Sequence, residues 1–211
     1  MNISGDKAED LILVQECLNG DKEAFNKLIK KYELPIYNLA FRMMGSNEEA
    51  LDAAQESFLR AYKALKSFRL EYSFFTWLYT ISINVCRNCL KRKKILNFLS
   101  ISSSSKQTEE NNHADIELPD NRMNPEIIYE EKKRSEIIQT AIMKLPDKYK
   151  GIVIARYVEG LAYEEIAKIE NIPLGTVKTQ IHRAKKILIR HIKNAKKMHD
   201  DKLAHGIMKI T

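Results

Sequence analysis

The stretch from Leu161 to Leu188 constrains this chain more than any other, because it has the pattern of a helix, a tight turn and a second helix. Asn171 suits the left-handed residue that ends a first helix. Pro173 suits the first position of a new helix, where its missing N–H costs nothing. In the second segment apolar residues recur at helical spacing, at Val177, Ile181, Ala184 and Leu188. The pattern predicts a helix-turn-helix.

The remaining faces of this second helix are polar and basic. They carry Lys178, Thr179, Gln180, His182, Arg183, Lys185 and Lys186. Such a helix fits the major groove of B-DNA, where Arg, Lys, Gln and Thr side chains read base edges. Its first backbone N–H groups, near Leu174 to Thr176, can bind a phosphate. A two-helix hairpin with a solvated basic face is the alternative interpretation.

The charge of the chain favours an anionic partner. Its 211 residues carry a net charge of +7, so we expect nucleic acid before a membrane surface. A second basic cluster, Arg87 with 91–94, lies in the first half. Apolar runs are too short to span a bilayer, and the acidic N-terminus does not suit a secretory signal. We expect no membrane insertion and a cytoplasmic location.

No catalytic or metal-binding pattern is found. The three cysteines are too few and too unevenly placed for a disulfide scaffold. Cys86 and Cys89 form a lone CxxC, whereas a structural zinc site needs four ligands. We expect these two cysteines to be ordinary thiols, and the alternative is that they bind a metal or take part in redox chemistry. Phosphate-binding glycine loops and nucleophile–base pairs are missing from the sequence, so we expect neither an enzyme nor a cofactor.

Helical periodicity without strand alternation predicts an all-α fold of two small helical domains. The first domain is expected at 8–96 and the second at 125–195, followed by a tail at 196–211. Between them, residues 97–124 are polar and acidic without a period, which is typical of a flexible linker. Pro35 should kink or split a helix of the first domain.

Two surfaces of the first domain are candidates for binding. In the helix 48–65 an inward stripe is predicted at Ala50, Ala54, Phe58, Ala61 and Leu65, and another face carries Asp52, Gln55, Glu56, Leu59 and Arg60. That second face is either a partner surface or a solvated one. Further on, residues 66–80 hold six aromatic residues ahead of the basic run 91–94. Aromatic planes beside cations suit unpaired bases, although a core role is the alternative.

Two separated motifs resemble one family. The sequences DAAQESFLRAYKALKSF and FFTWLYTISINVCRNCLKRKK are similar to the second conserved region of bacterial RNA polymerase sigma factors of the extracytoplasmic-function (ECF) type, within the sigma-70 family. The sequence LPDKYKGIVIARYVEGLAYEEIAKIENIPLGTVKTQIHRAKKIL resembles their fourth region. The family usually has Ser or Thr where this chain has Ala162, which removes a capping oxygen worth about 1 kcal/mol. The tail after Lys193 has no counterpart in the family pattern.

The resemblance implies a sigma factor that binds core RNA polymerase, directs it to promoter DNA and helps melt the minus-ten element. Residues 52, 55, 56, 59 and 60, named above, would dock on the clamp coiled coil of the largest polymerase subunit. The implied minus-ten contacts are Arg69, Ser73, Trp77, Asn84, Arg87, Asn88 and Lys91. The implied minus-thirty-five contacts are Gly175, Thr176, Lys178, Thr179, Gln180, His182, Arg183 and Lys186. An anti-sigma factor is a further implied partner. The alternative is a helix-turn-helix repressor or activator that binds duplex DNA without polymerase.

Overall fold

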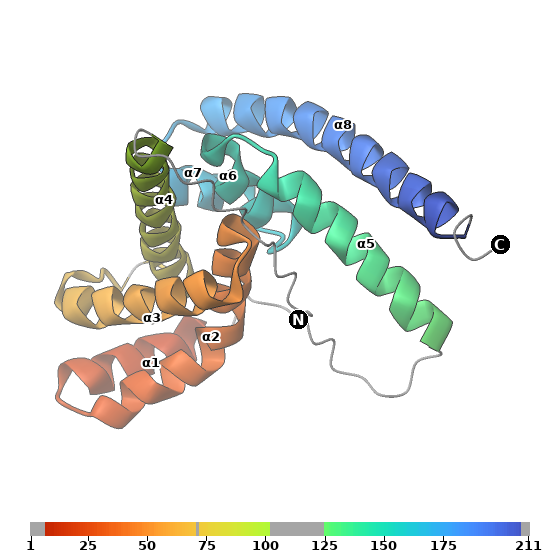
Figure 1. Cartoon of the computed structure of the whole chain (residues 1–211). Coiled ribbons are helices and arrows are strands. Elements are labelled where there is room, and N and C mark those ends of the chain that lie inside the picture. Colours follow the sequence, from red (N-terminus) through yellow and green to blue (C-terminus); the bar gives the residue numbers. More distant parts are fainter. Residues whose placement is uncertain (1–6, 71, 102–124, 208–211) are drawn as a thin grey trace.

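Helices account for the regular structure of the residues that the computed structural model describes, which are 7–70, 72–101 and 125–207 (Figure 1). In chain order they are α1 (Lys7–Leu18), α2 (Lys22–Met44), α3 (Asn47–Ala64), η1 (Leu65–Ser67), α4 (Phe74–Ile101), α5 (Pro125–Met143), α6 (Asp147–Tyr157), α7 (Tyr163–Glu170) and α8 (Leu174–Ile207). The predicted all-α class is confirmed. Most of the predicted linker, 102–124, lies outside the described residues.

Helices α1 to α4 pack around the apolar stripe that the sequence predicts for α3. Its members are all buried: Ala50, Ala54, Phe58, Ala61 and Leu65. The helix ends carry the expected caps, because the Asp21 carboxylate accepts the Glu23 N–H at 2.8 Å and Ser46 Oγ accepts the Glu49 N–H at 3.4 Å. Gly45 ends α2 in the left-handed conformation, with a φ of 78°. Local sequence signals therefore set the helix ends in this domain.

Pro35 lies inside α2, which continues as one helix on both sides of it. The sequence left a kink and a split open, and the helix is not split. An internal proline costs about 3 kcal/mol. Tyr32, Ile36 and Leu39 on the flanking turns are all buried in the same core, and each contributes about 1.5–3 kcal/mol. Burial of both halves therefore outweighs the lost backbone bond.

Helices α7 and α8 form the predicted helix-turn-helix. Asn171 ends α7 in the left-handed region, with φ 51° and ψ 47°. Pro173 was expected at the first position of the second helix, but it precedes that helix, because α8 begins at Leu174. The Pro173 carbonyl accepts the N–H groups of Thr176 and Val177 at 2.9 and 3.1 Å. Of the predicted apolar stripe, Val177, Ile181 and Ala184 are buried and Leu188 is half-buried.

Two helices continue beyond the expected limits of their domains. Helix α4 extends to Ile101, although the linker was expected from 97, and α8 extends to Ile207, although a tail was expected from 196. Glycine and proline, which stop helices, are missing from 75–101 and 176–205, and Gly206 lies at the very end of α8. Despite these lengths, none of the described helices combines the span and the apolarity needed to cross a bilayer.

The two domains pack against each other. Helices α5 and α6 contact α2, and α7 contacts α4. Buried side chains from both domains form one continuous apolar cluster. Helices α5 and α8 lie side by side and extend together away from α1–α4 (Figure 1). The surfaces of the first and second domains are therefore held in a fixed relation in this arrangement.

Candidate nucleic-acid interface

The outward face of α8 presents most of the residues expected to contact duplex DNA. Gly175, Lys178, Thr179, His182, Arg183 and Lys186 are exposed, and Thr176 and Gln180 are half-buried. The Thr179 hydroxyl donates to the Gly175 carbonyl at 2.9 Å, so its proton is directed back at its own helix. In this rotamer Thr179 can accept a hydrogen bond from a base but cannot donate one.

Gly175 lies in open space in the first turn of α8. A Cβ built on it would meet nothing within 4 Å, so packing inside the chain does not require a glycine at this position. Gly175 instead leaves the first turn without a covering side chain, although the Thr176 N–H, which was expected to be free, donates to the Pro173 carbonyl at 2.9 Å. This end of α8 can therefore come close to an external phosphate.

The start of α7 shows how the chain manages without the capping oxygen that Ala162 lacks. The Glu165 side chain accepts the Ala162 N–H at 2.9 Å. This is one half of a capping box, in which the third helical residue reaches back to the cap. The other half is missing because an alanine side chain has no acceptor. Helix α7 therefore keeps one of its two usual N-terminal bonds.

The aromatic residues just before α4 and in its first turns mostly belong to the core. Phe68, Phe74, Phe75 and Tyr79 are buried. Trp77 is half-buried, with its ring centroid 5.1 Å from that of Phe68 and 5.6 Å from that of Phe74. Tyr72 is 40% exposed. The core interpretation therefore accounts for four of the six rings, and only Trp77 and Tyr72 offer surface for a stacked base.

A polar stripe lies on α4 beside these two rings. Asn84, Asn88 and Lys91 are exposed at i, i+4 and i+7, so they share one helix face. Arg69 is exposed and Ser73 half-buried just before the helix. The Ser73 carbonyl accepts the Trp77 N–H at 3.1 Å, so it closes the first turn of α4. The structure thus places four of the seven expected minus-ten residues, Trp77, Asn84, Asn88 and Lys91, on one side of α4 and two more just before it.

The seventh, Arg87, is engaged by the second domain. Its Nη2 donates to both carboxylate oxygens of Glu170, at 2.8 and 2.7 Å. Glu170 comes from α7, 83 residues further along the chain. A carboxylate of the helix-turn-helix domain is thus paired with an arginine that was expected to bind DNA.

The candidate partner surface on α3 is larger than predicted. Asp52, Gln55, Leu59 and Arg60 are exposed, and Glu56 pairs with Arg60 at 2.7 Å. This pairing lowers the pKa of the Glu56 carboxyl. Two exposed apolar residues of the same face were missed, Leu51 at 52% and Tyr62 at 44%. Their helical spacing from Leu59 was the signal available in the sequence.

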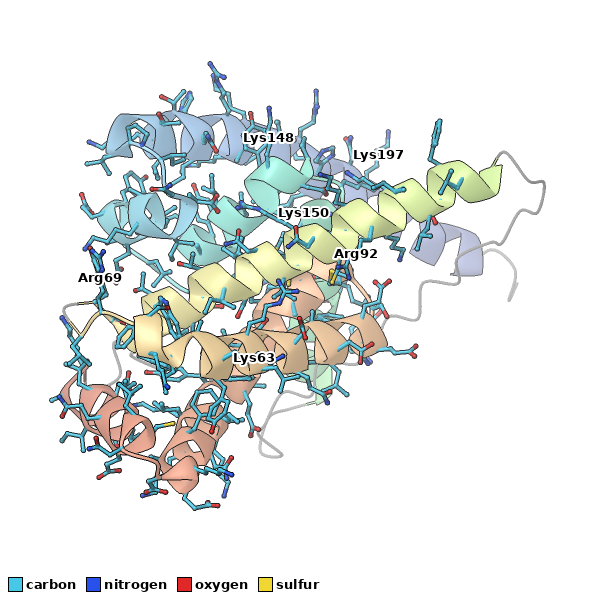
Figure 2. All side chains as sticks on the ribbon, turned by 90° about the vertical axis from the view of Figure 1, so that its left-hand side faces the viewer. Lys63, Arg69, Arg92, Lys148, Lys150 and Lys197 are labelled. Carbon is cyan, nitrogen blue, oxygen red and sulfur yellow. The ribbon has the colours of Figure 1, made fainter. Side chains whose placement is uncertain are left out.

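Basic side chains of both domains lie on one side of the molecule. Figure 2 shows this side, with Lys63 of α3, Arg69 and Arg92 from the first domain. It also shows Lys148 and Lys150 of α6 and Lys197 of α8. Lys150 is only 4% exposed and pairs with Asp147 at 3.3 Å, so it contributes little to the surface itself. The other cations are available to an anionic partner.

The CxxC pair lies within α4. Cys86 is fully buried, and burial raises the pKa of its thiol to about 12, so the group stays protonated. Cys89 is half-buried. In the part of the chain that the structure describes, no group of three or more His, Cys, Asp or Glu side chains is arranged to hold a metal ion. A protonated buried thiol is a poor nucleophile and a poor metal ligand.

Comparison with protein-family models finds two matches. Residues 28–95 match Sigma-70 region 2, and residues 135–188 match Sigma-70 region 4. Together they contain the α3 and α4 faces and the helix-turn-helix. The order of the two regions along the chain is the order expected from the sequence motifs.

Curated relatives agree with these matches over nearly the whole chain. The chain is 36% identical over 181 residues to the ECF RNA polymerase sigma factor SigW of Bacillus subtilis, covering 86% of this chain and 95% of that protein. It is 35% identical over 182 residues to the ECF RNA polymerase sigma-E factor of Haemophilus influenzae, covering 85% and 93%.

Solved structures share the fold at low sequence identity. The structure of CnrH in complex with the cytosolic domain of CnrY has a TM-score of 0.61 at 19% identity, covering 88% of this chain and 98% of that one. The sigma factor RpoE of Bartonella quintana, solved with the anti-sigma factor NepR, has a TM-score of 0.58 at 18% identity, covering 80% and 96%. These similarities concern the arrangement of the helices.

Proposed function

Because this chain belongs to the ECF-type RNA polymerase sigma factors of the sigma-70 family, we propose that it divides promoter recognition between the α4 face and the α8 face. The chain is an RNA polymerase sigma factor. A duplex-binding repressor or activator is not favoured, since such a protein has no need of the region 2 domain. The observation that carries the proposal is the presence of two separate exposed polar faces, one in each matched region.

The α8 face is proposed to read the minus-thirty-five element as duplex. Lys178, His182 and Arg183 project outward from the first turns of the helix and can reach base edges in the major groove. Lys186 lies further along and is placed for a phosphate. The bare N-terminus at Gly175 supports close approach to the DNA backbone, because its missing side chain has no role inside the chain.

The α4 face is proposed to hold the minus-ten element in its unpaired form. Opening a base-pair step costs on the order of 1–2 kcal/mol in lost stacking. A factor without ATP can offset this only by binding the open strand better. Trp77 and Tyr72 offer rings for stacking, which contributes roughly 1–3 kcal/mol per base. Asn84, with a donor and an acceptor exposed on the same side, can read the edge of one extruded base.

The exposed face of α3 is proposed to bind core polymerase on the clamp coiled coil of its largest subunit. Leu51, Leu59 and Tyr62 are exposed apolar residues on this face, with Gln55 between Leu51 and Leu59 and the Glu56–Arg60 pair at the edge. An apolar centre with a polar rim is typical of a protein interface. The ring of Phe25, 5.0 Å from that of Tyr62, supports the tyrosine from the core side.

The remaining partners follow from the family. Nucleotidyl transfer belongs to the polymerase in this proposal, so the chain contributes binding and no catalytic step. An anti-sigma factor is proposed as a regulator, because the Bartonella quintana neighbour is described with one. Polymerase and promoter DNA place the action in the cytoplasm.

The direct test is transcription from genomic promoter fragments with purified core polymerase. The full chain should produce specific transcripts that core polymerase alone does not, and the start sites should share two spaced upstream elements. Binding to duplex promoter fragments without polymerase, in the absence of any transcript, would instead support the repressor or activator alternative.

A further inference from the structure

The second domain docks on the flank of α4 that carries Arg87, and from this contact we propose that Glu170 competes with DNA phosphate for Arg87. In the closed arrangement α7 holds the arginine, and binding of the open minus-ten strand requires α7 to leave. The inference rests on the proposed function, because it takes Arg87 as a phosphate-binding residue. It adds an internal partner, α7, to that surface.

Both carboxylate oxygens of Glu170 lie within hydrogen-bond distance of one Arg87 nitrogen. Arg87 Nη2 lies 2.8 Å from Glu170 Oε1 and 2.7 Å from Oε2. The Glu170 side chain is 8% exposed and that of Arg87 is 30% exposed. A DNA phosphate presents similarly spaced oxygens to the same guanidinium. Glu170 therefore occupies Nη2 and neutralises the charge of Arg87, so a phosphate has to compete with it for this arginine.

The chain makes room for this pair at Gly151 of α6. A Cβ built on Gly151 would lie 3.2 Å from Glu170 Oε1, 3.3 Å from Arg87 Nη2 and 3.3 Å from Ile83 Cδ1. Three helices, α4, α6 and α7, thus converge on the ion pair, and a glycine occupies the tightest point. Any side chain at position 151 would press directly on the Arg87–Glu170 contact.

Two further contacts join the same faces. Lys168 of α7 lies over the ring of Tyr72, with its Nζ 5.7 Å from the ring centroid. At the other end of the contact, Lys94 of α4 pairs with Asp147 of α6. Tyr72, Arg87 and Lys94 are spread along the DNA-facing flank of the first domain. The second domain therefore covers this flank along most of its length.

The adjacent base-reading stripe stays uncovered. Asn84, Asn88 and Lys91 are all exposed in the closed arrangement, whereas Arg87 and Lys94 are turned toward the second domain. Docking therefore pairs Arg87 and Lys94 with acids of the second domain and leaves the Asn84, Asn88 and Lys91 stripe accessible. The competition is for the backbone of the strand, so it does not depend on the DNA sequence.

The closed contact leaves some buried polar atoms unpaired. Three buried polar atoms at the junction, Arg42 Nε, Tyr79 Oη and Gln139 Oε1, have no hydrogen-bond partner among the described residues. Unpaired buried polar atoms raise the free energy of the arrangement that buries them. A phosphate that replaces Glu170 leaves Arg87 paired, so opening loses no charge pairing at this position.

The test measures binding of the full chain to a fluorescent 12-nucleotide single-stranded DNA of mixed sequence, by anisotropy. Glu170→Gln keeps the side-chain shape and removes the charge that holds Arg87. We expect about three- to tenfold tighter binding, the range of a partly buried ion pair. Lys168→Ala is a second variant. It lowers the positive charge, which alone would weaken binding, yet the proposal predicts a gain because the contact with Tyr72 is lost.

The matched control is Glu164→Gln, which changes the net charge equally at an exposed position on α7. It should bind as the wild type does. In an Arg87→Ala background, Glu170→Gln should give no gain. Equal gains for Glu170→Gln and Glu164→Gln, or a gain that persists without Arg87, would overturn the proposal. Core-dependent transcription is measured separately, so failure of the sigma-factor assignment would be distinguishable from failure of this contact.

Discussion

Gly45 and Met143 lie in such close contact that a Cβ on the glycine would come within 2.8 Å of the methionine Cε. The end of α2 thus abuts the end of α5, in the other domain. Gln139 of α5 strengthens the contact by donating to the carbonyls of Phe41 and Arg42, at 3.2 and 3.4 Å. These are among the last carbonyls of α2, and the Phe41 carbonyl also accepts the Gly45 N–H at 2.8 Å. The second domain therefore caps a helix of the first.

The first prediction is that Gly45→Ala destabilises the protein more than Gly160→Ala. Both glycines have a positive φ, 78° and 70°, so both changes incur about 1–2 kcal/mol of backbone strain. Only Gly45 has a neighbour in the way, since Gly160 has nothing within 4 Å. Urea unfolding measures the two losses. Equal losses, or a difference that survives in a Met143→Ala background, would contradict a role for the contact.

The second prediction concerns pH. Burial raises the pKa of Glu159 to about 7, and Arg42 draws it partly back. Arg42 and the Tyr79 hydroxyl are the ionisable groups that face it. Between pH ~4.5 and ~7 the unfolded chain releases this proton and the folded chain keeps it. The contribution of Glu159 to the free energy of unfolding is therefore fully present below pH ~4.5. It decreases by up to ~1.4 kcal/mol per pH unit as the pH rises and is lost above pH ~7.

Thermal unfolding between pH 5 and 8 measures this dependence. Glu159→Gln cannot release a proton, so the contribution of this residue to the slope should disappear. Glu164→Gln, at an exposed position, should keep the wild-type slope. If Glu159→Gln and the wild type had parallel profiles, the carboxyl at 159 would titrate as an ordinary exposed acid.

The third prediction concerns core polymerase. Leu59→Ala and Tyr62→Ala should each weaken binding about five- to thirtyfold, because large side chains at an interface centre contribute about 1–2 kcal/mol. Leu18 on α1 is also exposed, at 42%, and Leu18→Ala is the matched control. Competition with a labelled sigma factor for purified core measures the affinities. Unchanged affinity in both α3 variants would place the polymerase contact elsewhere.

The fourth prediction separates melting from duplex recognition. Asn84→Ala should impair transcription from duplex templates, and a pre-melted bubble at the minus-ten element should restore part of it. Lys178→Ala should not be rescued in this way, because its loss affects a duplex contact upstream. Single-round transcription on both templates gives the comparison. If the bubble helped Asn84→Ala no more than it helps the wild type, Asn84 would have no part in melting.

The fifth prediction concerns the α8 face. Lys178→Ala and Arg183→Ala should each cost about 1–3 kcal/mol on the preferred minus-thirty-five sequence and relax the preference. Lys185→Ala and Lys186→Ala should weaken binding to all sequences and lower the slope of affinity against salt by about one. Holoenzyme binding at several salt concentrations tests this. Four uniform, salt-dependent losses would exclude base reading by Lys178 and Arg183.

Features with a local cause were predictable from the sequence. The stripe of Val177, Ile181 and Ala184 follows from helical periodicity, and the left-handed Asn171 from its residue type. Tyr62 was also within reach, since it shares the helix face of Leu59, but an exposed tyrosine on an amphipathic helix carries no strong signal. Whether the expected contacts at these faces form stays a prediction.

The packing of the two domains was not predictable in the same way. Arg87 and Glu170 are 83 residues apart, and nothing in a single sequence pairs one arginine with one of many acids. The lengths of α4 and α8 were underestimated for a different reason. The lack of a helical period over 97–124 and the end of the family pattern near 195 set the expected limits, whereas the helices continue because glycine and proline are missing from 97–101 and 196–205.

The continuity of α8 has a mechanical consequence. The helix has 34 residues, so it is about 51 Å long at 1.5 Å per residue. The residues expected to read DNA lie in its first turns, and α5 packs along it further on. A stiff rod of this length turns a tilt of about 10° at the DNA into a swing of roughly 9 Å at its far end. A protein that grips the carboxyl-terminal end of α8 can therefore turn the recognition helix as a lever that pivots at the DNA.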